Sequence, residues 1–286
     1  MTSSKSFGDP SSITGSMSPL LRYAVLFIVA AIVLVPLFAT ALGGFKTLGD
    51  LRVNPFGLPA HWEWSNYWDI LGGGRYWRLM LNSLVIAVLT VVLTVTVSAM
   101  AAFTFVHVRF YGSDFLFNYL LLGLMFPAAT AILPLFIKIR DLGLLDTYWG
   151  VVLPQVAFGL ATSILLFRNY FKQLPPDLFE ASQIDGCGYF RFFWYIVLPL
   201  SRPILATVAV IVFVHSWNGY LLPLVVFNRD SLYTWPLGIM AYQGEYSTDW
   251  HLVLAFITLT ILPAVVMFFA AQKHIVAGLT CGSVKG

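Results

Sequence analysis

The chain has 286 residues, of which 59% are hydrophobic and only 10% carry a charge. About a quarter of the residues of an average soluble domain are charged, so this composition excludes such a domain and indicates a membrane protein with several spans. The net charge of +3 is too small to indicate nucleic-acid binding, and no basic run with interleaved aromatic residues is present. The two cysteines, Cys187 and Cys281, match no metal or redox spacing.

Six apolar runs without Asp, Glu, Lys or Arg are predicted to form transmembrane helices. Because about 20 apolar residues in a helix cross a bilayer core of about 30 Å, each run is long enough to span it. The runs cover residues 23–42, 79–106, 115–137, 147–167, 203–228 and 250–272. The predicted fold is therefore that of an all-α, polytopic membrane protein with six transmembrane helices.

The first run is expected to be a retained span, because it is longer than the about 7 to 15 apolar residues of a signal peptide. The segment 1–18 before it is rich in Ser, Thr, Gly and Pro, which is the composition of a disordered tail. After it, the connector 43–78 contains many Trp and Tyr residues. We expect these rings at the membrane interface, where such side chains are enriched.

Internal prolines occur in five of the six runs, and this favours a bundle that moves over a static anchor. The Lys and Arg residues leave the orientation open. If the amino terminus is inside, nine of them lie on the inner side and seven on the outer side. The even number of spans places both termini and the loop after the fourth run on one side.

A polar loop between the fourth and fifth runs contains the start and stop signals of a helix. Two prolines at positions 175 and 176 suit a helix start, and Asp177 and Glu180 then lie in the first turns, where the helix dipole favours anions. Gly186 suits the helix end. The pattern predicts a short helix over residues 175–185 and a bend at 186–188.

A second short helix is predicted over residues 189–197, ending before Pro199. On the first helix, Leu178, Ala181 and Asp185 share one side at spacings of three and four. Such a surface of small and apolar residues fits a groove on a partner protein or lies on lipid, and the spacing alone favours neither reading.

Three short motifs in this loop resemble the EAA loop of ATP-binding-cassette importer permeases. They are Glu180-Ala181-Ser182, Asp185-Gly186-Cys187, and Ile196 followed by Leu198-Pro199. The sequence departs from the family pattern at Ser182 and Cys187, where alanine is usual, and both changes keep the side chain small.

The likeness extends over nearly the whole chain. It is greatest to the carbohydrate-uptake permeases, the group that includes the shorter membrane subunit of the maltose transporter. Supporting stretches are Asn82-Ser83-Leu84, Ile132 to Phe136, Leu142-Gly143-Leu144, Trp217-Asn218, Leu222-Pro223-Leu224 and the ending from Gly278 to Gly286.

The resemblance implies a type I importer permease fold in a bacterial inner membrane, with both termini and the EAA loop in the cytoplasm. The implied parts are an amino-terminal tail over residues 1–21, the permease domain over 22–272 with its coupling loop over 174–199, and a carboxyl-terminal tail over 273–286. It also implies that the coupling loop contacts a separate ATPase dimer. The residues concerned are Glu180, Ala181, Ser182, Asp185, Gly186, Leu198 and Pro199.

Two further contacts are implied by the same resemblance. The carboxyl-terminal tail would reach the ATPase dimer through Gly278, Leu279, Val284, Lys285 and Gly286, although a frayed end is the plain alternative. An outer loop would reach the solute-binding protein, although its composition is also that of an ordinary polar loop. Its residues are Tyr242, Gln243, Gly244, Glu245 and Tyr246.

Polar residues within the runs are candidates for a sugar path. Asn82, Trp217, Asn218 and Tyr220 could bind hydroxyls or stack on a sugar ring, but contacts between helices are the commoner use of such residues. No run holds an Asp, Glu, Lys or Arg, which argues against an ion-coupled carrier.

The chain lacks the GxxxxGK[ST] phosphate loop, so we expect no ATPase activity of its own and no cofactor or metal. The resemblance supplies the expected partners: a second homologous permease, an ABC ATPase dimer, an extracytoplasmic binding protein, a carbohydrate and the lipid bilayer. Glycerol phosphate or a polyol is the alternative substrate. A membrane scaffold that uses the loop only for binding is the alternative of another class.

Overall fold

The computed structural model describes residues 19–108, 110–244 and 246–280. For residues 19, 267, 270, 271 and 273–280 it describes the backbone only. Within these limits the chain is helical, and its one β feature is an isolated bridge between Gln243 and Thr248. The predicted all-α fold is confirmed. The chain divides into two compact units, one formed by residues up to 68 with 249–258 and the other by 69–248 with 259 onward.

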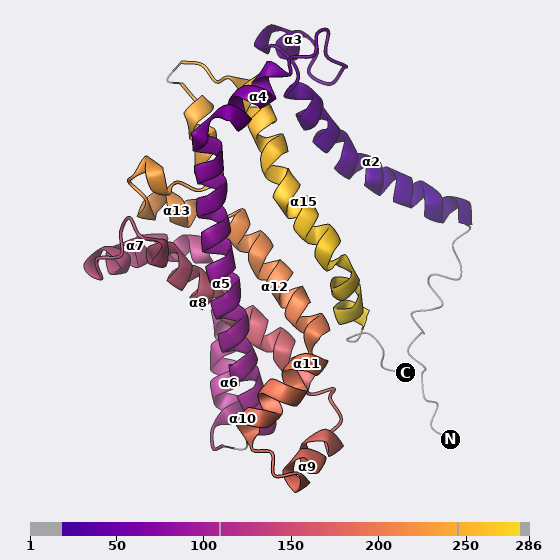
Figure 1. The fold of residues 1–286 in the computed structure, drawn as a ribbon, viewed down its shortest axis with the longest axis vertical. Coiled ribbons are helices and arrows are strands. Elements are labelled where there is room, and N and C mark those ends of the chain that lie inside the picture. Colours follow the sequence, from indigo (N-terminus) through magenta and orange to yellow (C-terminus); the bar gives the residue numbers. More distant parts are fainter. Residues whose placement is uncertain (1–18, 109, 245, 281–286) are drawn as a thin grey trace, which may run out of the picture. The chain divides into compact units, whose positions relative to one another are not determined.

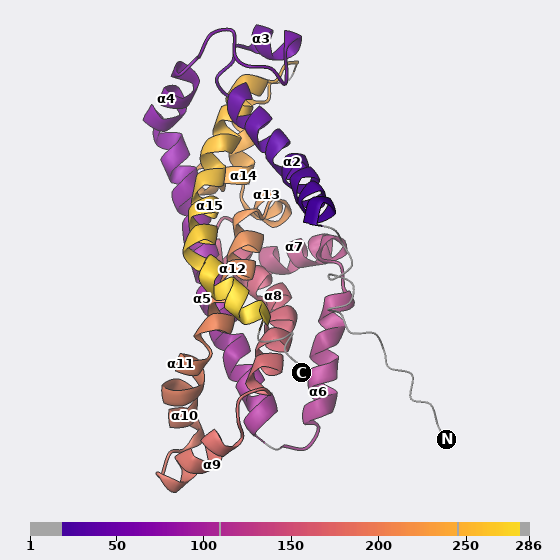
Figure 2. The same cartoon turned by 90° about the vertical axis from the view of Figure 1, so that its right-hand side faces the viewer.

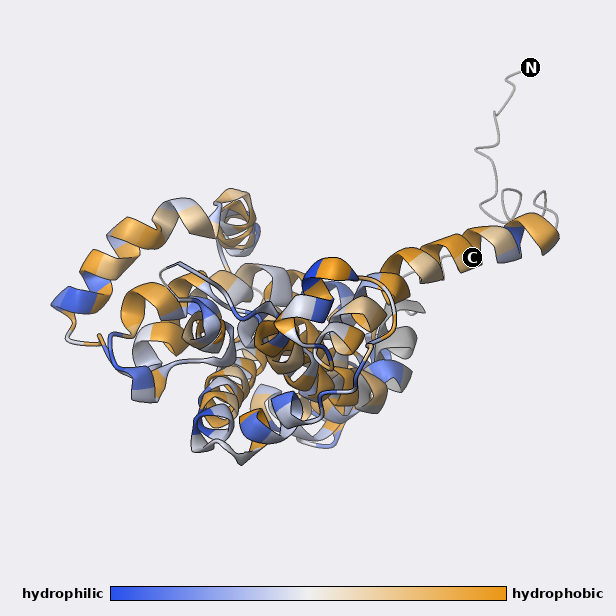
Figure 3. Ribbon diagram, turned by 90° about the horizontal axis from the view of Figure 1, so that it is seen from above, coloured by the Kyte–Doolittle hydropathy of each residue, from blue (hydrophilic) through white to orange (hydrophobic). Residues whose placement is uncertain are grey.

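The smaller unit begins with α2 (Pro19–Gly43), which contains Pro36. None of the residues in its apolar window is buried within the unit, as suits a helix surrounded by lipid or by another subunit. Figure 3 shows α2, next to the grey amino-terminal trace, apolar along nearly its whole length. The unit also holds α3 (Leu48–Val53), the beginning of α4 (Ser65–Gly72) and the beginning of α15 (Trp250–Thr280).

The connector after α2 folds around a buried lysine and an aromatic cluster. Lys46 is fully buried, and its Nζ donates to the backbone carbonyls of Asn54 and Pro55. The ring of Phe45 lies 4.4 Å from that of Tyr67 and 4.7 Å from that of Trp64. The residues expected at the membrane interface therefore also build a small module.

The larger unit is organised around three apolar helices: α5 (Gly74–His107), α8 (Tyr148–Phe171) and α12 (Arg202–Trp217). Figure 1 and Figure 2 show α8 and α12 beside α5. Small side chains at Ser98, Ala99 and Ala102 are buried on α5 and let the neighbouring helices approach closely.

The remaining elements of the larger unit are short. They are α6 (Ser113–Leu121), η1 (Leu122–Met125), η2 (Ala128–Ala131), α7 (Ile132–Asp141), α9 (Asp177–Ile184), α10 (Tyr189–Phe192), η3 (Phe193–Val197), α11 (Leu198–Leu200), α13 (Leu221–Val226), η4 (Asp230–Leu232), α14 (Trp235–Gly238) and η5 (Ile239–Tyr242).

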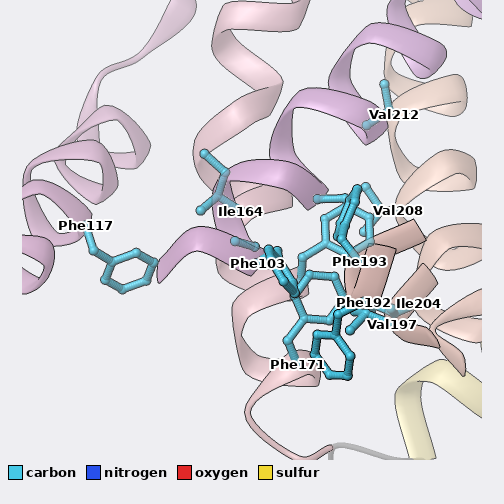
Figure 4. Close-up of a cluster of buried hydrophobic side chains, with 13 residues drawn as sticks. Phe103, Phe117, Ile164, Phe171, Phe192, Phe193, Val197, Ile204, Val208 and Val212 are labelled. Atoms are coloured by element: carbon cyan, nitrogen blue, oxygen red, sulfur yellow. The ribbon is translucent and has the colours of Figure 1, made fainter. Parts of the chain in front are cut away.

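A cluster of buried phenylalanines joins the helices at the carboxyl-terminal end of α5. Figure 4 shows Phe103 of α5 beside Phe192 and Phe193 of the polar loop, with Phe171 of α8 below them. The ring of Phe103 lies 5.1 Å from that of Phe193 and 6.0 Å from that of Phe192. The loop after α8 is therefore packed into the helical core of this unit.

Two of the predicted spans are broken. The run 115–137 forms two helical segments, Ser113–Met125 and Ala128–Asp141, bent by 87°. The break falls at Pro127, whose backbone is extended. The run 203–228 is interrupted after Trp217, and α13 begins afresh at Leu221 with Pro223 in its first turn, where a proline is tolerated.

The described residues contain three helices that are long and apolar enough to cross a membrane: Leu20–Gly43, α5 and α8. The bent pair just described and the pair formed by Tyr189–Leu200 and Arg202–Trp217 pass the same test only together. Trp250–Val266 is a shorter apolar helix. The count of six spans therefore stays a prediction.

Candidate functional site

The predicted first helix of the polar loop is present as α9, and it begins two residues later than expected, with Pro176 at the position before its first residue. Its end is a Schellman motif. Gly186 adopts a φ of 72°, the Gly186 amide donates to the carbonyl of Gln183 at 3.0 Å, and the Cys187 amide donates to that of Ser182 at 2.9 Å. The glycine stop inferred from the sequence is confirmed.

The second helix was predicted to end before Pro199, and this prediction was wrong. It runs from Tyr189 to Leu200 and contains a π-helical turn, η3, that ends two residues before Pro199. Pro199 is the second residue of α11, the short turn that follows η3. The chain then bends by 79° into α12.

The packed side of α9 is held by Phe179. Its ring is stacked 5.9 Å from that of His107, the last residue of α5, and lies 5.0 Å from Phe192 and 5.1 Å from Tyr189 of α10. Leu178 packs against the same cluster. These contacts attach α9 to α5 and α10, so α9 and the end of α5 are expected to move together.

The rest of the α9 surface is exposed in this chain. Glu180, Ala181 and Asp185 are exposed, and Ile184 keeps 86% of its surface exposed. Of the three residues expected to share one side, Ala181 and Asp185 are thus exposed, whereas Leu178 is packed. Ser182, expected among the contact residues, is instead buried at 4%, and its Oγ donates to the carbonyl of Phe179 at 2.7 Å. Its side chain faces its own chain because it shares the side of Leu178 and Phe179.

The other predicted coupling residues follow the two helices. Gly186 is exposed at the bend, Leu198 is half-buried, and Pro199 is exposed. Sequence reasoning missed Phe179 and Ile184 as members of this site. The large apolar side chain of Ile184 beside a glycine stop was the available signal.

The polar loop and the outer loop lie at opposite ends of α5. Phe179 contacts His107 at its carboxyl-terminal end, whereas Asp230 pairs with Arg75 at 2.6 Å and Arg78 at 3.3 Å near its start. At 1.5 Å per residue the 32 steps from Arg75 to His107 span about 48 Å, more than a bilayer core of about 30 Å. Figure 1 shows α9 beyond the lower end of α5.

The outer loop forms a tight hairpin. Gln243 pairs with Thr248, and the Gly244 amide donates to the carbonyl of Ser247 at 2.8 Å. Tyr246 is 93% exposed at the tip, while burial raises the pKa of Tyr242 at the base. Gln243 and Gly244 are exposed, and Glu245 lies outside the described residues. The residues predicted to meet a binding protein therefore include one that projects freely.

The segment before this hairpin is clamped by polar contacts. The Asp146 carboxylate accepts hydrogen bonds from the amides of Asn228 at 2.6 Å and Arg229 at 3.2 Å. These bonds, the first above all, hold the pKa of Asp146 below its usual value. Asp146 itself adopts a φ of 54°, which is uncommon for a residue other than glycine.

Asn82, a candidate for the sugar path, belongs to the same clamp. Its Nδ2 donates to the carbonyls of Ser231 and Tyr233, both at 2.9 Å, and its Oδ1 accepts from the Tyr148 hydroxyl at 2.7 Å. Because Asn82 is only 3% exposed and its amide is engaged, it holds the outer segment and is not available to a ligand.

The other three path candidates separate in the structure. Trp217 is 2% exposed and stacked on Phe213 at 5.5 Å, so it is a packing residue. Asn218 and Tyr220, in the break between α12 and α13, line a cavity of about 430 Å³. Gln155 of α8 and His215 of α12 line it too, although the sequence had not marked either of them as a site residue.

The predicted contacts of the carboxyl-terminal tail are barely described. Gly278 and Leu279 fall in the last residues of α15, whose backbone alone is described there. Val284, Lys285 and Gly286 lie outside the described residues. Among the described residues no group of three His, Cys, Asp or Glu side chains could hold a metal ion.

A family model described as the binding-protein-dependent transport system inner membrane component matches residues 94–280. The diacetylchitobiose uptake system permease protein NgcG of Streptomyces coelicolor is 32% identical over 267 residues, covering 93% of this chain and 88% of its own. The sn-glycerol-3-phosphate transport system permease protein UgpE of Yersinia pestis is 37% identical over 266 residues, covering 90% and 94%.

The fold is also similar to that of a chain in the crystal structure of a bacterial ABC transporter involved in the import of the acidic polysaccharide alginate. The TM-score is 0.78 at 23% sequence identity, and the match covers 95% of this chain and 100% of the other. At this identity the likeness is one of fold.

Proposed function

Because the chain belongs to the binding-protein-dependent transport system inner membrane component family, we propose that it is one of two homologous permease subunits of an ATP-binding-cassette importer. With its partner permease it forms the path of a carbohydrate that an extracytoplasmic binding protein delivers. The relative named for diacetylchitobiose uptake supports a carbohydrate. The relative named for sn-glycerol-3-phosphate supports the second candidate, a glycerol phosphate or a polyol.

The observation that carries this proposal is the two-sided packing of α9. One side is attached to α5 through Phe179, and the other presents Glu180, Ala181 and Ile184 to a partner. In the proposed mechanism this exposed side docks in a groove of an ATPase dimer. ATP binding closes the dimer and carries α9 with it, so that the core helices change between inward and outward access.

The free energy required sets a scale for this docking. A ratio of 1:99 between two states is converted to 99:1 by about 5.5 kcal/mol of differential binding. The contacts of α9 and of the tail residues 278–286 with the ATPase would have to differ between the two states by that order. A helix attached on one side and free on the other transmits such a difference without unfolding.

Reconstitution tests the function directly. The complete complex of both permeases, the ATPase dimer and the binding protein is placed in proteoliposomes, and uptake of radiolabelled ligand is measured. We expect ATP-dependent uptake that also requires the binding protein. A membrane scaffold would show assembly without uptake, and this outcome would overturn the proposal.

The orientation makes a separate prediction, because the polar loop is proposed to face the cytoplasm and the hairpin the outside. In a background with Cys187→Ala and Cys281→Ala, the variant Tyr246→Cys should react readily with a membrane-impermeant thiol reagent in intact cells. The variant Gln173→Cys, exposed between α8 and α9, should react only after permeabilisation. Ready labelling at 173 in intact cells would refute the orientation.

A further inference from the structure

Gln155 is held by hydroxyl groups from two other helices. Its Oε1 accepts a hydrogen bond from Thr90 Oγ1 of α5 at 3.1 Å and another from Ser216 Oγ of α12 at 2.6 Å. In this orientation of the amide both hydroxyls meet the carbonyl oxygen, and the two N–H donors of Nε2 point elsewhere. Nε2 makes no hydrogen bond to any residue that the structure describes.

The free donors lie beside the cavity of about 430 Å³. A Cβ atom added at Gly219 would stand 3.0 Å from Gln155 Nε2, and both residues line that cavity. Its volume lies within the range of about 300 to 1,000 Å³ of small-ligand sites. Gln155, Phe158 and His215 also line a second cavity of about 160 Å³ further along α8 and α12. The amide thus lies beside both cavities.

The larger cavity shares one lining residue with a hollow beside the outer hairpin. Tyr220 lines it, and also lines a hollow formed with Trp235, Met240 and Gln243. Gln243 is the first residue of the hairpin bridge. Tyr220 therefore stands between the hollow beside the hairpin and the cavity at Gln155.

The lining has the chemistry of a site for a neutral, hydroxylated ligand. None of the residues around the three spaces is Asp, Glu, Lys or Arg. An anion placed there would lose its hydration without gaining a fixed cation, which is costly in a low-dielectric site. Amide and hydroxyl groups can instead bond sugar hydroxyls, and the rings of Phe158 and Tyr220 offer flat apolar faces.

We propose that this subunit itself holds a saccharide subsite at Gln155, in which Nε2 donates to a hydroxyl of an uncharged sugar passing from the hairpin inward. Thr90 and Ser216 are positioning residues that fix the amide. The proposal rests on the proposed transport function. It distinguishes this chain from the relative named for sn-glycerol-3-phosphate and from the importer of an acidic polysaccharide, whose ligands are anions.

A coupling measurement tests the subsite. In proteoliposomes containing the complete complex, Gln155→Met should lower the sugar imported per ATP hydrolysed about tenfold, equivalent to about 1.4 kcal/mol. ATP hydrolysis stimulated by the loaded binding protein should stay within about twofold of wild type, because α9 is unchanged. Thr90→Val should lower the import ratio about threefold. The matched control is Thr94→Val, one turn along α5, buried, and outside both cavity linings.

Wild-type import per ATP in Gln155→Met overturns the proposal. If that variant fails to assemble, equal import by Thr90→Val and Thr94→Val overturns it instead. A wild-type complex without ATP-dependent uptake would contradict the transport function, so the two failures can be distinguished.

The charge of the transported ligand provides an independent test of the subsite. The cognate binding protein is offered diacetylchitobiose, arabinotriose, sn-glycerol 3-phosphate and an alginate disaccharide. Retention and ATP-driven import of a neutral saccharide support the subsite. Import of an anionic ligand in place of the neutral saccharides overturns it.

Discussion

Replacement of Gly186 by valine is expected to abolish substrate-stimulated ATP hydrolysis in the assembled complex while leaving membrane insertion intact. Gly186 adopts a φ of 72°, and nothing lies within 4 Å of a Cβ added there. The penalty is therefore one of backbone conformation and not of packing, and is about 1 to 2 kcal/mol for a residue with a side chain, more for a β-branched one. The Schellman end of α9 would open, and the exposed side of α9 would lose its fixed direction.

The neighbouring Gly188 provides a matched control. It also has open space around an added Cβ, but its φ of −76° and ψ of 167° are ordinary extended values. Gly188→Val should therefore keep stimulation within about twofold of wild type. Gly186→Asn should be intermediate, because asparagine tolerates the left-handed region better than valine. Normal substrate-stimulated ATP hydrolysis in Gly186→Val would contradict the coupling hypothesis.

The second large effect is expected for Phe179→Ala. The substitution removes the ring contacts with His107, Tyr189 and Phe192 that attach α9 to the bundle. We expect the free energy of unfolding to fall by about 2 kcal/mol. This is less than the about 3 to 5 kcal/mol lost when a fully buried phenylalanine is replaced by alanine. The exposed side of α9 keeps its residues, so the ATPase should still bind. ATP hydrolysis should continue, but it should no longer respond to the loaded binding protein.

The comparison for this variant is Phe115→Ala on α6. Phe115 is 77% exposed, and its ring contact is with Tyr119 at 6.5 Å. The same chemical truncation there should leave the stimulation ratio unchanged. Co-purification of the ATPase with both variants checks assembly, and the stimulation ratio then reports coupling. A Phe179→Ala complex that responds like wild type would show that α9 transmits force by another route.

The α9 helix could be read from the sequence because its signals are local. Two prolines define its start, and Gly186 defines its stop through a backbone conformation that glycine adopts readily. Which side of α9 packs against the rest of the chain could not be read from local signals. Ser182 carries a small polar side chain that fits either side of α9, and the rings that pack against its neighbour Phe179 come from α5 and α10.

The sugar path shows the same limit. Asn82 and Gln155 are both amides within predicted spans, and nothing around them in the sequence separates their roles. The Nδ2 group of Asn82 donates to two backbone carbonyls that lie 149 and 151 residues away in the sequence. The Oε1 atom of Gln155 instead accepts from two hydroxyls 65 and 61 residues away, and its Nε2 donors make no hydrogen bond to the described residues. Their difference is a property of the packed helices.

The breaks in two of the predicted spans also could not be predicted from composition. Hydropathy measures whether a run suits lipid, and the runs 115–137 and 203–228 do. A break becomes favourable only where other groups satisfy the freed backbone. The carbonyl of Pro127 accepts from the hydroxyl of Thr130, and the carbonyl of Trp217 accepts from the indole of Trp235. The prolines indicated kinks but not their size.

The π turn before Pro199 gives the polar loop a tolerance in chain length. A π turn holds one residue more than an α turn between hydrogen-bonded partners. Because the wider turn takes up this residue, the helix on its two sides keeps nearly the relative rotation of an α-helix that is one residue shorter. Removing one residue from Phe193–Val197 should therefore restore α geometry and leave the direction of the exposed side of α9 nearly unchanged. Between Gly188 and Ser201 the chain can thus hold one residue more than a regular helix with the same side of α9 presented.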